Sequence, residues 1–162
     1  MKFRVASIHD VPVIQRIANE CWPVAYGEIL SKEQIVYMLD KMYSNTALEH
    51  QILEEGCEFI IATIDNEPIG FASWSLLSQE IAKLHKLYLL SSRKGKGYGK
   101  KLMHEVIIRV KEVKATTLEL QVNKNNPSQL FYLNYGFERA DEIVIDIGGG
   151  FVMDDYLMRY KL

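Results

Sequence analysis

The sequence predicts an α/β (α+β) fold in which helices flank a sheet built largely from hairpins. Two β-forming segments, 58–64 and 69–77, flank an Asp-Asn-Glu-Pro turn, and two more, 137–147 and 151–161, flank three consecutive glycines. Between these hairpins, a strand predicted at 81–90 leads through a glycine-rich turn into an amphipathic helix. We therefore expect a sheet of mixed direction with helices packed against it.

The first third of the chain is predicted to be mainly helical. After an alternating strand at 2–6, apolar residues at helical spacing predict a helix that ends where Pro23 and Gly27 interrupt it. Ser31 begins a capping box and predicts a second helix through about Met42, with a further helical segment after it.

The remaining elements lie between the glycine-rich turn and the last hairpin. A β-forming run predicts a strand at 116–122. Pro127 suits the first turn of a short helix that ends at Tyr135, where Gly136 stops it.

Length and composition indicate one domain over residues 1–162. The chain is 48% hydrophobic and 25% charged, which suits a compact core but leaves no room for a second domain. The formal net charge of −2 argues against a nucleic-acid partner, since such surfaces normally show a basic excess.

The cysteines and histidines indicate no metal and no disulfide framework. Cys21 and Cys57 form no C-x-x-C pair, and the four histidines lack the spacing of metal ligands. The first ten residues have no apolar leader segment and no apolar run is long enough to cross a bilayer, so we expect a cytoplasmic protein without a membrane partner.

A glycine-rich basic turn is the first candidate binding site. Gly95, Gly97 and Gly99 alternate with larger residues, so the backbone can turn tightly and approach a ligand. Residues 91–101 carry five cations and no acid at a predicted helix N-terminus, which suits a diphosphate. The alternative is a solvated basic turn without a ligand.

Two common nucleotide loops do not fit this segment. A P-loop would need glycine at Lys94 and a hydroxyl at Lys101, and the dinucleotide fingerprint would need glycine at Lys100 or Leu102. The pattern [Q/R]-x-x-G-x-[G/A] does fit, from Lys94 to Gly99, and it resembles the pyrophosphate loop of the GCN5-related N-acetyltransferases, the GNAT superfamily. Lys94 departs from the usual Gln or Arg, and the arginine stands one place earlier.

A second segment carries the same resemblance. VNKNNPSQLFYLNYGF is similar to the GNAT pattern N-x-x-[A/S]-x-x-[F/L]-Y followed by Gly-Phe, and the match places Asn125, Ser128, Phe131 and Tyr132 on it. The two motifs stand in the family's order with a strand between them. The chain is thus identified as a GNAT member, which implies a mixed, mostly antiparallel sheet of about six or seven strands. In this fold the fourth and fifth strands run parallel and splay, and acetyl-CoA lies in the split.

The resemblance also implies roles for individual residues. The end of the fourth strand would offer backbone groups to the pantetheine arm and acetyl carbonyl through Leu87, Tyr88 and Leu89. The pyrophosphate would be held by Lys94, Gly95, Lys96, Gly97, Tyr98, Gly99 and Lys100. Asn125 and Ser128 would contact the cofactor, and Tyr132 would give a proton to the departing thiolate. The alternative for Tyr132 is core packing beside Phe131.

The base that deprotonates the amine is less evident. Many relatives have a glutamate near the end of the fourth strand, where this chain has His85. A histidine base would suit neutral pH. The role could otherwise fall to ordered water or to Glu28, and His85 would then be a structural residue.

The acceptor is the most open feature. Acidic residues gather in the last predicted hairpin, namely Glu138, Asp141, Glu142, Asp146, Asp154 and Asp155. They suggest a cationic acceptor, or they only form a solvated face. Trp22 and Tyr26 could form a pocket wall or pack in the core. The ending and the early aromatic loop look similar to bacterial GNATs that acetylate polyamines.

Two functions from different classes follow from these observations. The first is direct acetyl transfer from acetyl-CoA to a primary amine of a small molecule, with a polyamine as one choice, or of a peptide. The second is a catalytically silent acetyl-CoA-binding module that regulates a partner. Tyr132 favours the enzyme, because a sensor needs no proton donor, and the family resemblance is compatible with a homodimer.

Overall fold

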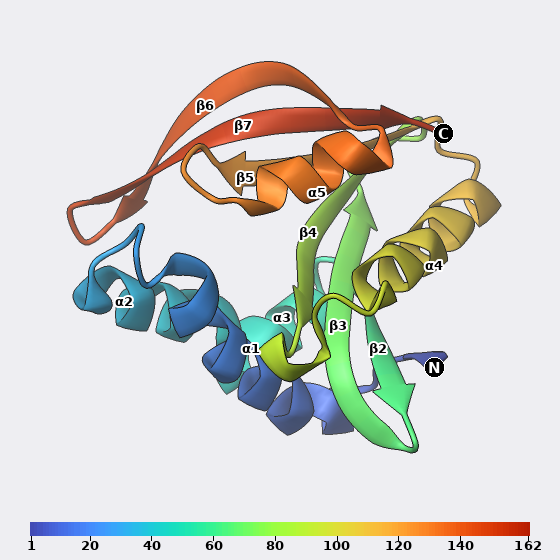
Figure 1. Ribbon diagram of the computed structural model, residues 1–162, viewed down its shortest axis with the longest axis horizontal. Coiled ribbons are helices and arrows are strands. Elements are labelled where there is room, and N and C mark those ends of the chain that lie inside the picture. The colour runs from blue at the N-terminus through green and yellow to red at the C-terminus, as the bar shows by residue number, and fades with distance from the viewer.

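Seven strands form one sheet in the computed structural model, which describes residues 1–162 (Figure 1). The strands lie in the order β1-β2-β3-β4-β5-β7-β6, and every neighbouring pair is antiparallel except β4–β5. Their bounds are β1 Lys2–Val5, β2 Glu58–Ile64, β3 Glu67–Leu76, β4 Ile81–Leu89, β5 Thr117–Asn123, β6 Glu138–Gly148 and β7 Phe151–Lys161. The predicted mixed sheet is confirmed.

Five α-helices pack on the two faces of this sheet. They are α1 Val11–Tyr26, α2 Lys32–Tyr43, α3 Asn45–Leu53, α4 Tyr98–Glu112 and α5 Ser128–Tyr135, with short 3-10 turns at Ile8–Asp10 and Ser91–Arg93. The first three helices share one apolar cluster with the β2 and β3 side chains Phe59 and Phe71. None of the helices combines the length and apolarity that a bilayer crossing requires.

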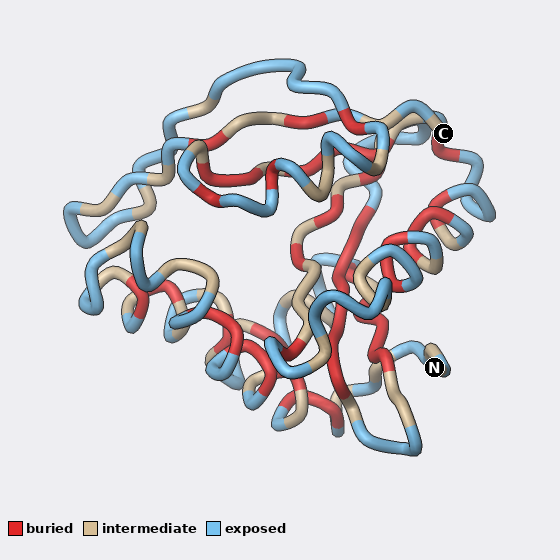
Figure 2. The backbone as a smooth tube through the Cα atoms, in the orientation of Figure 1, coloured by how far each residue is buried: buried red, intermediate tan, exposed pale blue.

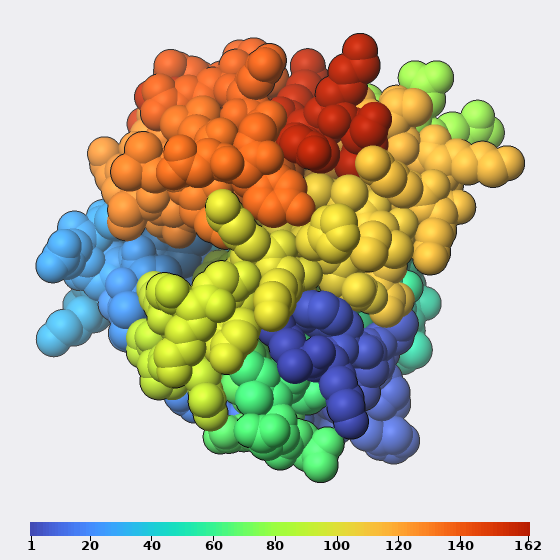
Figure 3. All heavy atoms as spheres, turned by 45° about the vertical axis from the view of Figure 1, so that its right-hand side comes forward, coloured from blue at the N-terminus to red at the C-terminus, as the bar shows by residue number.

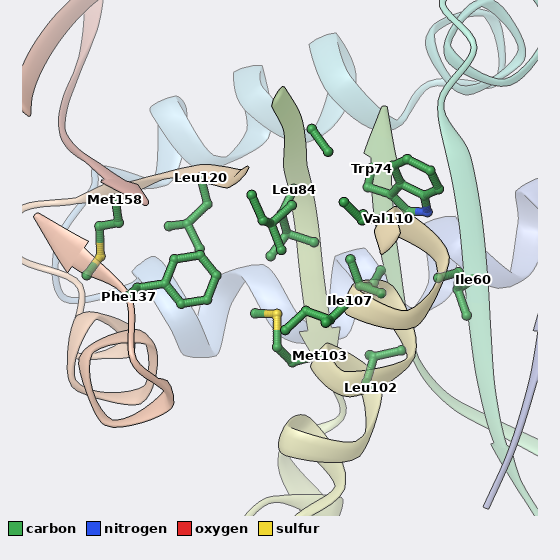
Figure 4. Close-up of a cluster of buried hydrophobic side chains, with 14 of the residues drawn as sticks. Ile60, Trp74, Leu84, Leu102, Met103, Ile107, Val110, Leu120, Phe137 and Met158 are labelled. Atoms are coloured by element: carbon green, nitrogen blue, oxygen red, sulfur yellow. The ribbon is translucent and has the colours of Figure 1, made fainter. Parts of the chain in front are cut away.

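The second apolar cluster lies on the α4 side of the sheet and spans both halves of it. Figure 4 shows Met103 and Ile107 of α4 close to Leu84, with Leu120 and Phe137 beyond them. Figure 2 shows that burial is concentrated in the central strands, whereas β6 is exposed along most of its length. The two halves thus meet in one apolar cluster, next to the segment where β4 and β5 are paired.

The sheet opens between β4 and β5, as expected for a splayed GNAT sheet. The parallel pairing runs only from Ile81 opposite Thr117 to Leu84 opposite Leu120. Beyond Leu84, β4 stays paired with β3, and β5 stays paired with β7. Backbone groups of β4 that would have faced β5 are therefore left without a strand partner in the split.

A β-bulge at His85 accompanies the opening. Ser73 pairs with Lys86 and Trp74 pairs with Leu84, so His85 has no partner residue on β3. The extra residue reverses the side-chain alternation. Leu84 belongs to the α4-side cluster, whereas the ammonium of Lys86 lies over the ring of Phe59 on the opposite face.

The first helix differs from the sequence prediction. We expected Pro23 to interrupt it, but α1 continues through Pro23 and ends at Tyr26, so that prediction was wrong. Because proline has no N–H, the carbonyl of Asn19 loses its helical hydrogen bond. Asn19 is exposed, so water can hydrate that carbonyl. Trp22, 1% exposed, anchors the same turn in the core.

The starts of the second and third helices agree with the sequence prediction. The hydroxyl of Ser31 accepts a hydrogen bond from the backbone N–H of Gln34 at 3.1 Å, as the capping pattern predicts. The further helical segment expected after the second helix is α3, which begins at Asn45. The hydroxyl of Ser44 caps it and accepts a hydrogen bond from the backbone N–H of Ala47 at 3.3 Å.

Candidate active site

A cavity of about 520 Å³ occupies the split between β4 and β5. Its walls come from β4, the segment that leads into α4, the end of β5, α5 and the C-terminal turn of α1. Figure 3 shows a recess between the orange α5 region and the yellow-green segment before α4, with blue helices behind it. Opening of the sheet therefore produces a hollow that is enclosed by elements between α1 and α5 in the chain.

The glycine loop forms one end of this cavity. Gly95 and Gly97 have φ values of +77° and +74°, which side chains other than glycine rarely adopt. A Cβ on either would meet no protein atom within 4 Å, so the loop backbone borders open space. Gly97 is the N-cap of α4 without any side-chain cap, which leaves the N–H groups of the first helical turn free for an anion.

Cations surround the same loop, and the whole arrangement fits a diphosphate. Lys94 and Lys100 line the cavity, together with Tyr98 and Gly99. Lys96 is exposed and does not line it. The fit rests on backbone donors and helix polarity, and does not depend on which basic side chain stands at Lys94.

The β4 wall is made of the three residues expected there, since Leu87, Tyr88 and Leu89 all line the cavity. Because β5 has moved away at this level, unpaired backbone groups of β4 face the split. Such groups can hydrogen-bond an extended ligand as a neighbouring strand would.

Tyr132 of α5 lies in the cavity wall opposite β4. Burial raises the pKa of its phenol, and Tyr26 nearby raises it further. Its ring packs edge-on against Phe131 at 5.3 Å and Phe137 at 5.7 Å between centroids. The ring is thus held firmly, and its hydroxyl keeps its proton at neutral pH.

The loop before α5 differs from the motif match by one residue. Ser128 lines the cavity, but the asparagine that lines it is Asn126, whereas Asn125 does not. Asn126 is buried, and its Oδ1 accepts the N–H of Ser128 at 2.8 Å. The sequence offered no signal to separate two adjacent asparagines, because only the turn geometry decides which one faces inward.

His85 lines the cavity and is engaged by a neighbour. Its Nε2 forms a 2.8 Å hydrogen bond with the hydroxyl of Ser75 on β3. Burial lowers the pKa of His85 to about 4, and the positive charges of Lys86 and Lys83 contribute. The imidazole is therefore neutral at pH 7, and it binds a proton weakly.

The two aromatic residues of α1 singled out in the sequence, Trp22 and Tyr26, have different surroundings. Trp22 is buried and does not line the cavity, whereas Tyr26 does. The two rings lie 4.6 Å apart, and the Tyr26 hydroxyl is 3.5 Å from the hydroxyl of Tyr88. Glu28, the other residue suggested in this stretch, is exposed and outside the cavity lining.

The two adjacent aspartates of β7 have different surroundings. Asp154 is half exposed and forms an ion pair with Lys124 at 2.7 Å. Asp155 is 4% exposed, and its Oδ1 has no hydrogen-bond partner. Neither belongs to the cavity lining, but Asp155 lies near enough to raise the pKa of Tyr26, after the larger effect of burial.

The polar lining residues Ser91, Lys86 and Gln121, like Asn126, were missing from the sequence prediction. Gln121 of β5 accepts a hydrogen bond from the ammonium of Lys83 at 2.6 Å. Lys86 is buried, and burial lowers its pKa to about 8. Polar residues inside otherwise apolar strands were the only available signal, and they did not reveal which face opens onto a cavity.

Comparisons with known proteins agree with this geometry. A family model described as an acetyltransferase (GNAT) domain matches residues 28–153. The [ribosomal protein bS18]-alanine N-acetyltransferase of Haemophilus influenzae is 34% identical over 77 residues, which are 48% of this chain and 52% of that protein. The chain thus aligns with about half the length of that relative.

Solved structures show the same fold over the full chain. PaiA N-acetyltransferase from Thermoplasma acidophilum, in complex with coenzyme A, has a TM-score of 0.83 and 27% identity, with all of both chains covered. A GCN5-related N-acetyltransferase structure from Rhodopseudomonas palustris has a TM-score of 0.84 at 19% identity, covering 99% of this chain and 95% of that one. With the matched domain, the split sheet and the glycine loop in agreement, this chain belongs to the GNAT acetyltransferase family.

Proposed function

We propose that this protein transfers the acetyl group of acetyl-CoA directly to a primary amine, carried by a small polyamine-like molecule or by a peptide. The observation that carries the proposal is a single cavity that joins a diphosphate-binding loop, an unpaired strand edge and the hydroxyl of a half-buried tyrosine. A phosphate site alone would serve a sensor equally well. The tyrosine adds a proton donor beside the strand edge.

The glycine loop and the first turn of α4 would hold the pyrophosphate, and the free edge of β4 at Leu87–Leu89 would hold the pantetheine arm and the acetyl carbonyl. When bound, acetyl-CoA supplies a thioester whose C–S bond breaks as the bond to the acceptor nitrogen forms. Tyr132 would give its proton to the departing sulfur, because burial keeps the phenol protonated. His85 would orient the acceptor or accept a proton from it.

The relatives support the reaction, and the name of one of them indicates a peptide acceptor. The Thermoplasma protein is described with coenzyme A, and the Haemophilus relative is named for an alanine of a ribosomal protein. A polyamine and a peptide with a free N-terminus each carry at least one amine that can be protonated at neutral pH. The acidic hairpin favours a cationic acceptor.

The test is release of the CoA thiol from acetyl-CoA across a panel of amines. Spermidine and 1,4-diaminobutane represent polyamines, and a short peptide with a free N-terminal alanine represents the other kind. The same peptide with a blocked N-terminus and a reaction without acceptor are the controls. Turnover above these controls with at least one amine is expected. Binding of acetyl-CoA without turnover on any amine would instead support a catalytically silent regulatory module.

A further inference from the structure

We propose that Asp155 of β7 binds the protonated amine of the acceptor and removes a proton from it before the nitrogen attacks. This inference rests on the proposed acetyl transfer and adds a catalytic residue to it. Four observations support the assignment: the position of Asp155 beside the split, its burial without a partner, the charges around it and the state of His85.

The position of Asp155 follows from strand register. It pairs with Asn123, the last residue of β5, beyond the point where β4 leaves β5. Directly opposed residues share a face of the sheet, and alternation puts Asn123 and Gln121 on one face. Gln121 lines the cavity from this face and Val122 lines it from the other. Met153, which shares its face of β7 with Asp155, packs with Tyr26 against the cluster of the first three helices, so Asp155 lies on the face turned toward α1.

The hairpin that carries Asp155 is secured at its far end. Tyr37 of α2 donates from its hydroxyl to the carbonyl of Ile147 at 2.8 Å, and its ring packs on Phe151 at 5.4 Å. Gln34 donates from Nε2 to the carbonyl of Val152 at 3.2 Å. Figure 1 shows the β6–β7 hairpin reaching over to α2. The strand that presents Asp155 is thus held from both ends.

The burial of Asp155 calls for a donor that the protein does not provide. The side chain is 4% exposed, and Oδ1 is buried without any hydrogen-bond partner. A buried polar atom left unsatisfied costs about 1–3 kcal/mol, and a charged one costs more. Its neighbour Asp154 has the ion pair with Lys124. A ligand ammonium would satisfy Asp155, because it brings both charge and donors.

The charged groups around Asp155 leave its carboxylate without a close counter-ion. Lys83 on β4 is hydrogen-bonded to Gln121 at 2.6 Å, and Lys124, after β5, pairs with Glu142 and Asp154 at 2.8 and 2.7 Å. Tyr26 faces it from α1 as an uncharged phenol.

These surroundings set the acidity of Asp155 and the pH at which it can act. Burial raises its pKa to about 6, and Asp154 adds to this while Lys83 and Lys124 oppose it. The carboxylate is therefore ionised at pH 7 and basic enough to take a proton.

The histidine on β4 is a weaker candidate for the same task. Its Nε2 is engaged by Ser75, and its pKa is lowered to about 4 by burial and by Lys86 and Lys83. A base of such low pKa removes a proton from an ammonium less readily than one near 6. Asp155 also attracts an ammonium, whereas a neutral imidazole beside two lysines does not.

The protons balance with one base and one acid. A protonated primary amine must lose two protons to become an amide nitrogen. The first passes to Asp155 and then to solvent, which leaves a nitrogen lone pair to form the C–N bond. Tyr132 gives its proton to the sulfur as the C–S bond breaks, and it regains the second proton from the nitrogen. The products are the N-acetylated amine, CoA as a thiol and one released proton.

The first test measures recognition of charge without turnover. Calorimetry at pH 7 in the presence of CoA compares n-butylamine, which is protonated, with neutral n-butanol. We expect the wild-type protein to prefer the amine at least about tenfold. Asp155→Asn should abolish that preference, and it should fold normally because Oδ1 loses no partner in the protein.

Two further variants make this test specific to Asp155. Glu49→Gln removes an equal charge from an exposed residue of α3, outside the hairpin and the cavity lining, and should retain the preference. Asp154→Asn should reduce it by less than Asp155→Asn does. The proposal is overturned if Asp155→Asn keeps the preference, if Asp154→Asn abolishes it equally, or if the wild-type protein has none.

The second test is the pH profile of kcat/KM on one acceptor from the amine panel. Asp155 must be ionised to act, so activity should decline as pH falls through about 6, and Asp155→Asn should lose that limb. Comparing variants on the same acceptor cancels its own ionisation. A limb near pH 4 that disappears in His85→Ala would assign the base to His85 instead.

Failure of this inference differs from failure of acetyl transfer. If Asp155→Asn retains full turnover and the limb near pH 6, acetyl transfer stands and only the role of Asp155 falls. If wild-type protein binds CoA but releases no thiol with any amine, the transfer itself is wrong. In the first case the calorimetric preference for n-butylamine would also survive the substitution.

Discussion

The two ends of the cavity are built in opposite ways. The phosphate end comes from consecutive residues, Lys94 to Lys100, which form one turn and the start of one helix. The acceptor end brings together Tyr26 of α1, His85 of β4, Gln121 of β5 and the nearby Asp155 of β7. One end uses backbone groups, and the other uses side chains that only the fold assembles.

This difference separates binding of a common ligand from selection of a particular one. Backbone N–H groups at a helix N-terminus hold an anion whatever the adjoining side chains are, so lysine at position 94 can replace Gln or Arg. Side chains from four elements can each change without disturbing the loop. We therefore expect changes at the phosphate end to affect cofactor affinity, and changes at the acceptor end to affect turnover and acceptor choice.

The largest effect should come from Gly97→Val at the phosphate end. A Cβ there would project toward the ligand space, and a β-branched residue is strained at φ +74°. Affinity for acetyl-CoA, measured by calorimetry, should fall by at least about a thousandfold. Unchanged affinity in a folded variant would remove the loop from the binding site.

Gly56→Val provides the matched control for this substitution. Gly56 also has a positive φ, +65°, and open space around its Cβ position, but it lies outside the main cavity. It should lower stability through the same backbone strain and leave acetyl-CoA affinity within about twofold. Comparing Gly97→Val with Gly56→Val separates the effect of backbone strain on stability from the loss of acetyl-CoA binding.

A smaller effect is expected from Tyr132→Phe, which keeps the ring and its packing against Phe131 and Phe137. Turnover should fall by about 10²-fold or more, with little change in acetyl-CoA affinity, because only the transferable proton is lost. Tyr135→Phe on the same helix removes a hydroxyl outside the cavity lining and is the control. Equal turnover by wild type and Tyr132→Phe would exclude the tyrosine from proton transfer.

The smallest effect concerns the stability that depends on His85. Its pKa falls from the ordinary 6.5 to about 4 on folding, so between these values the unfolded chain binds a proton that the folded protein excludes. The free energy of unfolding should therefore decrease as pH is lowered through this window, by at most about 3 kcal/mol for His85. Urea titrations at several pH values measure it.

His85→Gln should make the pH dependence of the free energy of unfolding less steep in this window. Parallel curves for wild type and His85→Gln would show that burial of the imidazole does not limit its protonation. This result would also restore His85 as a base that acts near neutral pH.

Much of the fold follows from patterns within single segments. The strand predicted at 58–64 has those bounds in the structure, and Asp65 and Asn66 form the turn after it with positive φ values. The apolar face of α4 and the glycine-rich turn before this helix could also be predicted from the sequence. Pro23 was misread, because the breaker rule takes no account of whether the freed carbonyl reaches water.

The amino-acid sequence by itself determined the local units: the glycine loop, the helix that follows it and the two motifs that identify the family. Their geometry depends on neighbours in the chain, since a positive φ or a helix cap is set within a few residues. Only the tertiary structure decided that β5 leaves β4 after Leu84, that Asn126 faces inward and that Asp155 is buried without a partner. Those outcomes depend on register, on a bulge and on packing between segments more than a hundred residues apart, which no local pattern encodes.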